Sequence, residues 1–307
     1  MFTFFRFEDI WLNIMNNISK LVSIAHPRKC TFIAFDGVAP KAKMNHQRGR
    51  RFKSAKSSVE TNKNFASCGL TRESDGFRST SISPGTEFMN DLNDAIYFMI
   101  LKKMEEDENW RKMKIIFSGA NVPGEGEHKI MDFIRANKNR FLESDSHCVY
   151  SSDADMIMLT LVSGLKNVMV MRDPIAFRPA VLKATKRNLP LKHYEVIFIS
   201  LLREYMAIEF GTIKDKFEKI EFNVDRILDD FLALCNFVGN DFLPRLYTFQ
   251  IRTGRFDTLL DCFKTFLTTT DSYISDEGVI NFDALQYLIE LIVPKEMEFL
   301  NCKFNFI

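Results

Sequence analysis

Several features are absent from this sequence of 307 residues, and each absence excludes a class of protein. No apolar run reaches the ~18 uninterrupted residues of a membrane-spanning helix, so we expect no membrane partner. Arg6, Glu8 and Asp9 interrupt the first residues, where a secretory signal has a continuous apolar segment. The sequence also has no internal repeat and no low-complexity tract. We therefore expect a non-repetitive protein that is neither exported nor embedded in a membrane.

The six cysteines include no CxxC pair. They lie far apart in the chain, which is typical of reduced thiols in a cytosolic-type compartment. This spacing also excludes a cysteine-based zinc site. The positions are Cys30, Cys68, Cys148, Cys235, Cys262 and Cys302.

The composition is that of a globular protein with a large core. Hydrophobic residues make up 46% of the sequence, charged residues make up 26%, and the net charge is +1. A chain of this length can bury one large core or two ordinary ones, which excludes disordered and fibrous classes. Thirty phenylalanines stand against two tryptophans, and we expect most of these rings to lie in the core.

Apolar strands alternate with helices in the first part of the sequence, and helices alone follow in the second. Such alternation is typical of an α/β fold whose mostly parallel sheet is flanked by helices. We expect an α/β core at residues 1–190 and a helical region at 191–307 that completes the site described below. The pattern predicts strands at 30–35, 114–118, 148–151 and 168–171, a loop at 66–83, and helices at 9–25, 42–65, 83–104, around Ile130 and Ile134, 193–210, 224–238, 255–267 and 282–292.

Carboxylates follow three of the predicted strands, and one more follows an apolar stretch of the helical region. Ligands bind at the carboxyl ends of the strands in open parallel sheets. Acids at these positions can therefore converge on one edge of the sheet. There are six of them, from four segments: Asp36, Glu125, Glu127, Asp153, Asp155 and Asp241.

Six carboxylates at one edge would repel one another unless cations compensated them. Oxygen ligands without clustered histidine or cysteine suit Mg²⁺ or Mn²⁺ better than zinc. Two such ions about 4 Å apart commonly support phosphodiester hydrolysis, one activating water and the other stabilising the leaving oxygen. The pattern thus predicts a phosphoryl-processing site with two divalent metal ions.

Each acidic motif also has a simpler structural interpretation. Asp36 could cap a helix, and the carboxylates of Glu125 and Glu127 could favour a helix N-terminus electrostatically. Asp241 could form an Asx-turn, and the Asp153-x-Asp155 pair also occurs in sugar-nucleotide metal sites. Two further motifs are expected to have structural roles. His128 is expected to begin a helix, and Asp229-Asp230 are expected to pair with basic side chains.

The predicted helix at 42–65 is strongly basic, with no acidic residue between positions 41 and 56. Lys43, Gln47, Arg50 and Arg51 are spaced so that they share one helical face. Arginine offers bidentate donors to phosphate, lysine a point charge and glutamine an amide. This face can therefore hold a terminal phosphate. The other basic residues either follow a nucleic-acid backbone or keep the helix solvated: Lys41, Arg48, Lys53 and Lys56.

Four sequence blocks, in this order, resemble the Xrn family of 5′→3′ exoribonucleases, and together they span most of the chain. They are Asp36-Gly37-Val38-Ala39-Pro40-Lys41 running on to Gln47-Arg48-Gly49-Arg50-Arg51-Phe52, Val122-Pro123-Gly124-Glu125-Gly126-Glu127-His128-Lys129, Ser152-Asp153-Ala154-Asp155-Met156, and Val238-Gly239-Asn240-Asp241-Phe242-Leu243-Pro244.

The resemblance implies a PIN/FEN-like nuclease core that removes 5′-mononucleotides processively from single-stranded RNA. It implies that the six acids named above surround two divalent metals. It also implies that Lys43, Gln47, Arg50 and Arg51 hold the 5′-monophosphate of the RNA, and that decapping or RNA-decay factors are partners. A structure-specific endonuclease on the same core remains an alternative, which would cleave nucleic acid with blocked 5′ ends.

The sequence also departs from the family pattern at both ends. A family segment with one further metal-binding Asp and a base-stacking His is expected before the helix at 9–25, and it is missing here. The family's second stacking aromatic and its accessory domains are missing after residue 292. The chain is therefore expected to be truncated at both ends, and a catalytically inactive RNA-binding remnant or scaffold is the alternative function.

The segment 172–193 is short and has no cysteine. The nuclear branch of the family commonly carries a cysteine-containing insertion at this place. Together with the segments 201–206 and 270–274, this difference favours the cytoplasmic branch, which acts in mRNA decay. The expected location is therefore the cytoplasm, with the nucleus as the alternative.

Overall fold

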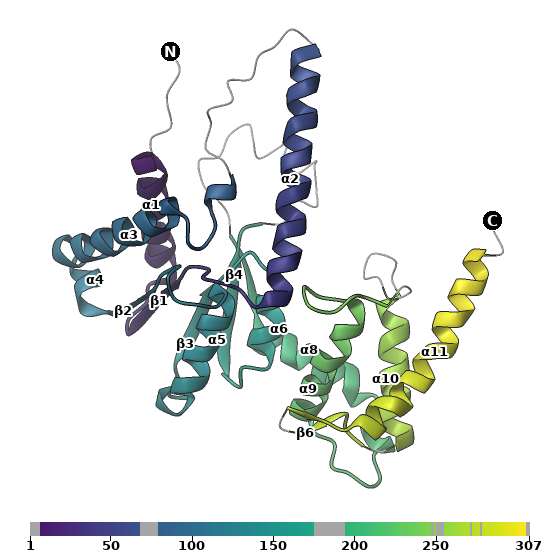
Figure 1. The fold of residues 1–307 in the computed structure, drawn as a ribbon. Helices are drawn as coiled ribbons and strands as arrows, with labels where there is room; N and C mark the ends of the chain where they lie inside the picture. The colour runs from purple at the N-terminus through teal and green to yellow at the C-terminus, as the bar shows by residue number, and fades with distance from the viewer. Residues whose placement is uncertain are drawn as a thin grey trace, which may run out of the picture. The chain divides into compact units, whose positions relative to one another are not determined.

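The computed structural model describes residues 7–67, 79–174, 194–246, 249, 255–270, 272–276 and 278–304 (Figure 1). Most of the predicted loop at 66–83 and most of the segment 172–193 lie outside these ranges. The chain forms two compact units, Met1–Ala136 and Asn137–Ile307. The first two strands and the next three form separate sheets, and the predicted division near residue 190 into an α/β core and a helical region stays a prediction.

Unit 1 contains two parallel strands and five α-helices among its described residues. β1 (Cys30–Ala34) pairs with β2 (Lys114–Ser118), and Ala34 lies opposite Ser118. The carboxyl ends of both strands therefore lie at the same edge, as predicted. The helices are α1 (Phe7–Ala25), α2 (Lys41–Ser67), α3 (Glu87–Glu106), α4 (Glu108–Lys112) and α5 (Gly126–Asn137), with a 3-10 turn, η1, at Ser79–Ser81.

Local sequence explains where these helices begin. Thr86 caps α3, because its Oγ1 accepts a hydrogen bond from the backbone N–H of Met89 at 3.4 Å. Asp107 ends α3 and caps α4 in the same way, accepting from the N–H of Asn109 at 2.9 Å. These short polar residues satisfy backbone donors that a helix start leaves unpaired.

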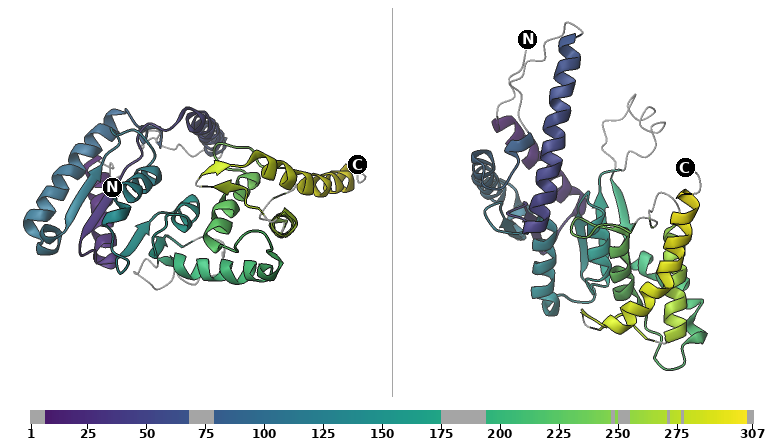
Figure 2. Two further views of the ribbon diagram at one scale, coloured as in Figure 1. Left: turned by 90° about the horizontal axis from the view of Figure 1, so that it is seen from below. Right: turned by 45° about the vertical axis from the view of Figure 1, so that its right-hand side comes forward.

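Helices cover both faces of the β1–β2 sheet. On one face, Ile33 and Phe117 pack against a core formed by α1, α3 and α4, which includes Ile96 and Trp110. On the other face, the ring of Phe32 stacks on Phe133 of α5, with centroids 4.8 Å apart. Figure 2 shows these helices on the two sides of the strands.

Unit 2 contains a three-stranded sheet, in the order β3-β4-β5, and a small hairpin. β3 (Ser146–Tyr150) and β4 (Asn167–Arg172) are parallel, whereas β5 (Glu195–Phe198) is antiparallel to β4. The hairpin pairs β6 (Ser275–Asp276) with β7 (Val279–Ile280). The helices among its described residues are α6 (Asp155–Leu161), α8 (Ile199–Gly211), α9 (Val224–Cys235), α10 (Phe256–Thr270) and α11 (Phe282–Phe304). The 3-10 turns there are η2 (Lys138–Arg140), η3 (Lys214–Lys216) and η4 (Asn236–Val238).

The core of unit 2 contains several phenylalanines, but the expectation that most of these rings lie in the core holds only in part, since others among the described residues are exposed, including Phe98 and Phe282. Phe210, Phe263 and Phe266 are completely buried. The rings of Phe210 and Phe263 meet edge to face with centroids 5.7 Å apart, and those of Phe263 and Phe266 stack at 6.3 Å. Aromatic pairs of this kind add to the stabilisation that burial alone provides.

The α/β class is confirmed, but the described strand pairs are as often antiparallel as parallel. A mostly parallel sheet therefore stays a prediction. The helix predicted at 193–210 is wrong at its start, because residues 195–198 form β5 and the helix begins at Ile199. The β-branched pair Val196 and Ile197 favours a strand where an open edge of β4 is available. In the described part of the chain, no helix is long and apolar enough to cross a membrane.

Candidate functional site

Asp36 lies where β1 ends and contacts the start of α5. Its Oδ1 accepts a hydrogen bond from the backbone N–H of Gly126 at 2.7 Å. A Cβ at position 126 would lie 3.3 Å from this oxygen, so glycine allows the close approach. The capping role considered for Asp36 is therefore present, although Asp36 remains exposed to solvent.

The two loops that follow β1 and β2 are held against each other through their backbones. Gly37 donates to the carbonyl of Gly124 at 2.8 Å, and Gly124 donates to the carbonyl of Val38 at 2.9 Å. A Cβ on residue 37 would lie 1.9 Å from the carbonyl oxygen of Val122. Gly124 has a φ of 104°, which side chains disfavour. Both glycines are thus required by the close contact between the loops.

Glu125 is a buried acid that forms an ion pair with Lys43 of α2. Its Oε2 lies 3.0 Å from the Lys43 Nζ, and the two side chains are 8% and 7% exposed. The other oxygen, Oε1, is buried and has no hydrogen-bond partner among the described residues. A buried carboxylate oxygen without a partner is costly. The Glu125 Oε1 is therefore a suitable ligand atom for a hard divalent cation.

Lys129 of α5 is a part of this edge that sequence reasoning missed. Its Nζ donates to the carbonyls of Phe35 at 2.8 Å and Gly119 at 2.9 Å, so it ties together the segments after β1 and β2. Burial lowers the pKa of Lys129, while the nearby carboxylate of Asp36 acts in the opposite direction. The available signal was a lysine on the face of α5 that carries Phe133 four residues later.

Glu127 and His128 lie in the first turn of α5. The Glu127 side chain is 13% exposed, and its Oε1 lies 4.0 Å from the His128 Nε2. A carboxylate in the first helical turn is favoured by the positive end of the helix dipole. The expectation that His128 begins a helix is confirmed, so its position needs no catalytic explanation.

The four residues predicted to hold a phosphate share one face of α2 but differ in exposure. Lys43 is buried with Glu125, Gln47 is half-buried, and Arg50 and Arg51 are exposed. The face thus runs from the carboxylate edge outward into solvent. It can present two guanidinium groups to an anion.

In unit 2, Asp153 and Asp155 stand together where β3 leads into α6. The backbone N–H of Asp153 donates to Ser151 Oγ at 3.1 Å, and that of Asp155 contacts Asp153 Oδ1 at 3.4 Å. Both residues are exposed. The structure thus brings these two predicted ligands together at the carboxyl end of a parallel strand.

Asp241 lies in a turn after η4 and is half-buried. Its neighbour makes an Asx-turn, because Asn240 Oδ1 accepts hydrogen bonds from the N–H groups of Phe242 at 2.9 Å and Leu243 at 2.8 Å. Gly239 has a φ of 86° and approaches Arg245 closely. Asn240 therefore shapes the turn, and the Asx-turn considered for Asp241 stays an interpretation.

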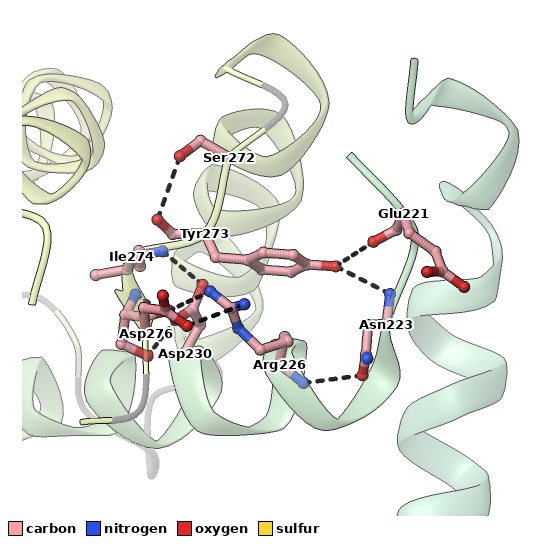
Figure 3. Close-up of polar contacts among 9 residues, drawn as sticks. Glu221, Asn223, Arg226, Asp230, Ser272, Tyr273, Ile274 and Asp276 are labelled. Carbon is pink, nitrogen blue, oxygen red and sulfur yellow. Dashed lines mark hydrogen bonds and ion pairs between the residues drawn. The ribbon is translucent and has the colours of Figure 1, made fainter. Parts of the chain in front are cut away.

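The Asp229-Asp230 motif has a structural role that centres on Asp230 of α9 (Figure 3). Asp230 is completely buried and accepts from the N–H groups of Ile274 at 2.7 Å and Ser275 at 2.8 Å, and from Ser275 Oγ at 2.7 Å. The prediction that the motif pairs with basic side chains holds in part, because Arg226 acts electrostatically on both carboxylates, but the hydrogen bonds that Asp230 accepts come from backbone N–H groups and a hydroxyl. Asp230 instead fixes the β6–β7 hairpin to α9.

Arg226, one turn before Asp230, completes this attachment (Figure 3). Its guanidinium lies 4.6 Å from the ring centre of Tyr273, donates to the carbonyl of Ser275 at 2.7 Å and pairs with Asp276 at 3.2 Å. The Tyr273 hydroxyl donates to the carbonyl of Glu221 and accepts from the N–H of Asn223. These polar groups line a cavity of about 520 Å³.

These observations define an α/β protein with carboxylates at strand ends in both units and a cationic helix beside one of them. Comparison with protein families is consistent with that class. Residues 5–174 match the family described as "XRN 5'-3' exonuclease N-terminus", and residues 221–303 match the "Xrn1 helical domain". The chain belongs to the XRN family.

The curated relatives described next are all named 5'-3' exoribonucleases. The chain is 41% identical to 5'-3' exoribonuclease 1 of Saccharomyces cerevisiae over 281 residues, 91% of this chain and 18% of the relative. It is 37% identical to the human 5'-3' exoribonuclease 1 over 295 residues, 94% and 17% of the two lengths. It is 34% identical to 5'-3' exoribonuclease 2 of Arabidopsis thaliana over 327 aligned positions, 93% and 32% of the lengths. The chain thus spans less than a third of each of these relatives.

Proposed function

We propose that this chain is the catalytic region of a 5′→3′ exoribonuclease that hydrolyses 5′-monophosphorylated single-stranded RNA to mononucleotides. The observation that carries the proposal is the buried Glu125 Oε1, which has no partner among the described residues and lies beside the start of the cationic face of α2. The names of the relatives support the same activity.

We further propose that two divalent cations, Mg²⁺ or Mn²⁺, bind to the predicted carboxylates. All donors are oxygen atoms, which suits these hard ions. When bound, such ions lower the pKa of water and stabilise charge on the leaving oxygen. The proposed ligands are Asp36, Glu125, Glu127, Asp153, Asp155 and Asp241.

The residues of α2 would select and position the substrate. Arg50 and Arg51 are exposed guanidinium groups that can bind a terminal phosphate bidentately, and Gln47 adds an amide donor. Lys43 lies deeper, where its Nζ pairs with Glu125 Oε2 at 3.0 Å. Holding the terminal phosphate here fixes the distance from the RNA end to the bond that breaks.

The chemistry explains why the same end can be used repeatedly. Water adds a hydroxyl group to the phosphorus between the first and second nucleotides, and the bond to the 3′ oxygen breaks, which takes up the proton. The first nucleotide leaves, and the remaining RNA carries a new 5′-monophosphate. The product is therefore again a substrate for the same cationic face.

The deciding experiment uses the purified chain with Mg²⁺ and two 3′-labelled RNAs that differ only in a 5′-monophosphate or a 5′-hydroxyl end. We expect chelator-sensitive loss of the monophosphorylated RNA, with release of mononucleotides. Binding without cleavage would support the RNA-binding alternative instead. Cleavage of RNA with a blocked 5′ end would favour the endonuclease alternative.

We also propose that the activity serves mRNA decay in the cytoplasm, together with decapping or RNA-decay factors. The support is the higher identity to proteins named exoribonuclease 1, at 41% and 37%, than to exoribonuclease 2, at 34%. A fluorescently tagged chain should be found outside the nucleus. Nuclear accumulation would contradict this part of the proposal.

A further inference from the structure

The outward side of α2 carries a second cationic surface, separate from the face that begins at Lys43. A helix turns about 100° per residue, so positions spaced by seven, four, four, three and four residues line up along one side. Lys41 is the first residue of this series, and Lys43 lies about 200° around the helix from it. We name this surface the outer stripe; its residues are Lys41, Arg48, Phe52, Lys56, Val59 and Lys63.

All six residues of the outer stripe are exposed. The Phe52 ring is 73% exposed and Val59 is 53% exposed. Beyond its first turns, α2 stands clear of the other helices and the sheet of unit 1, as the views of Figures 1 and 2 agree. The stripe is thus accessible along its length.

The cations of the outer stripe have no ion-pair partner among the described residues. Other exposed lysines of unit 1 do have one: Lys102 pairs with Glu106 at 3.8 Å, and Lys112 with Glu108 at 2.7 Å. α2 contains one acid, Glu60, in its 27 residues, and Glu60 does not belong to the stripe. A lysine and a glutamate four residues apart, as in the two pairs above, stabilise a helix. Within the residues that the structure describes, the cations of the outer stripe lack such pairs, and this distinguishes α2 from α3 and α4.

The spacing of the charges fits a polyanion. Intervals of seven and eight residues place successive cations about 10 to 12 Å apart along the helix axis. Phe52 lies between Arg48 and Lys56, where its exposed ring can stack on an unpaired base. Alternation of cations with a stacking aromatic is the chemistry that binds single-stranded nucleic acid without sequence preference.

We propose that the outer stripe is a second RNA-binding surface, which binds single-stranded RNA along α2 independently of the 5′ end. This inference goes beyond the proposed function, because it requires neither the carboxylates nor the phosphate-binding face. RNA bound here would keep the chain on a strand whose end is not engaged. The occupant is single-stranded RNA, since stacking on Phe52 needs an unpaired base.

The test measures binding of a fluorescent 5′-hydroxyl oligouridine by anisotropy in the presence of a chelator. One variant combines Lys41→Gln, Arg48→Gln, Lys56→Gln and Lys63→Gln. A matched control removes the same charge from exposed cations elsewhere, through Lys112→Gln, Arg140→Gln, Lys214→Gln and Lys216→Gln.

We expect the dissociation constant of the stripe variant to rise at least about tenfold. The slope of log affinity against log salt concentration should become shallower by about 0.7 for each phosphate that is no longer neutralised. The control should stay within about twofold of the wild type, since its four cations lie outside the outer stripe.

A stripe variant that binds like the wild type, or a control whose affinity falls as much, would overturn the proposal. A second measurement keeps it falsifiable if affinities are weak. The photoreactive replacement Phe52→p-benzoyl-phenylalanine should crosslink to the oligouridine and much less to a duplex of the same length. Because both measurements use a 5′-hydroxyl RNA without divalent metal, they can succeed even if the exonuclease assay fails.

Discussion

Lys43 and Glu125 form a buried ion pair in which the Nζ lies 3.0 Å from Oε2 and both side chains are more than nine-tenths buried. The two residues come from different elements, the first turn of α2 and the residue before α5. The pair therefore attaches the cationic helix to the loop that carries the acids. It also explains why α2 can project from unit 1 while its first turn stays fixed.

Removing either partner of this pair should destabilise the protein strongly. Lys43→Met leaves the carboxylate buried without its cation, and Glu125→Gln leaves the ammonium without its anion, each costing about 3 to 5 kcal/mol in similar pairs. The double variant should cost less than the sum of the two. Urea unfolding of the four proteins gives the coupling, and strictly additive effects would contradict the importance of the pair.

Lys129→Met should destabilise unit 1 by about 2 to 4 kcal/mol, because the carbonyls of Phe35 and Gly119 each lose a buried donor. Lys102→Met, an exposed lysine of the same unit, is the matched control and should change the free energy of unfolding by less than about 0.5 kcal/mol. Equal effects of the two substitutions would show that Lys129 does not join the strand ends.

Asp153→Ala and Asp155→Ala should each abolish RNA cleavage but leave RNA binding largely unchanged, because these acids are proposed to bind metal. Calorimetry with Mn²⁺ in the absence of RNA should show weaker or fewer binding events. Asp132→Asn, which changes an exposed acid paired with Arg135, is the control. Wild-type cleavage by either alanine variant would refute the proposed metal site.

Arg50→Ala should reduce the preference for 5′-monophosphorylated over 5′-hydroxyl RNA by about tenfold or more, which corresponds to one charge-assisted hydrogen bond of about 1.5 to 3 kcal/mol. Lys112→Ala, an exposed lysine of α4, is the control and should leave the preference intact. The ratio of the two cleavage rates is the measurement. A preference that persists in Arg50→Ala would exclude the proposed phosphate-binding role.

Asp230 should make stability depend on pH. Burial raises its pKa above the ordinary value of 3.8, although its hydrogen-bond donors and Arg226 act in the opposite direction. The folded state then holds the proton more tightly than the unfolded state. The contribution of Asp230 is therefore fully present below pH 3.8 and is lost as the pH rises through the raised pKa.

The measurement compares urea unfolding of the wild type with Asp230→Asn, which stays neutral, over a series of pH values. As the pH rises from 3.8 through the raised pKa of Asp230, the free energy of unfolding of the wild type should fall relative to that of Asp230→Asn. Above that pKa, the difference between the two proteins should be constant. A difference that moves in the opposite direction would mean that the hydrogen bonds outweigh burial.

Elements with a clear local pattern could be predicted from the sequence. The apolar run Ile115-Ile116-Phe117 gave the strand at 114–118, which the structure confirms at both ends. The helices predicted at 9–25 and 42–65 are confirmed as α1 and α2 within two residues at each end. Local propensity and periodicity are sufficient in such segments, because they do not depend on a distant partner.

What could not be predicted depends on contacts between distant segments. The burial of Lys43 requires Glu125, which lies 82 positions later, and Lys129 is buried only because two backbone carbonyls meet it. β5 forms because β4 offers an edge, although its sequence also continues a helical pattern. The convergence of the acids of both units on one metal site stays a prediction for the same reason.

The close contact between Gly37 and Val122 has an energetic consequence for any ligand of Asp36 and Glu125. The loops that carry these two acids are already locked together by backbone hydrogen bonds, so their conformational entropy is lost during folding and not during binding. Such preorganisation lowers the entropic cost of binding a ligand at this half of the site. Replacing Gly37 would thus loosen this half of the site without touching a single charged group.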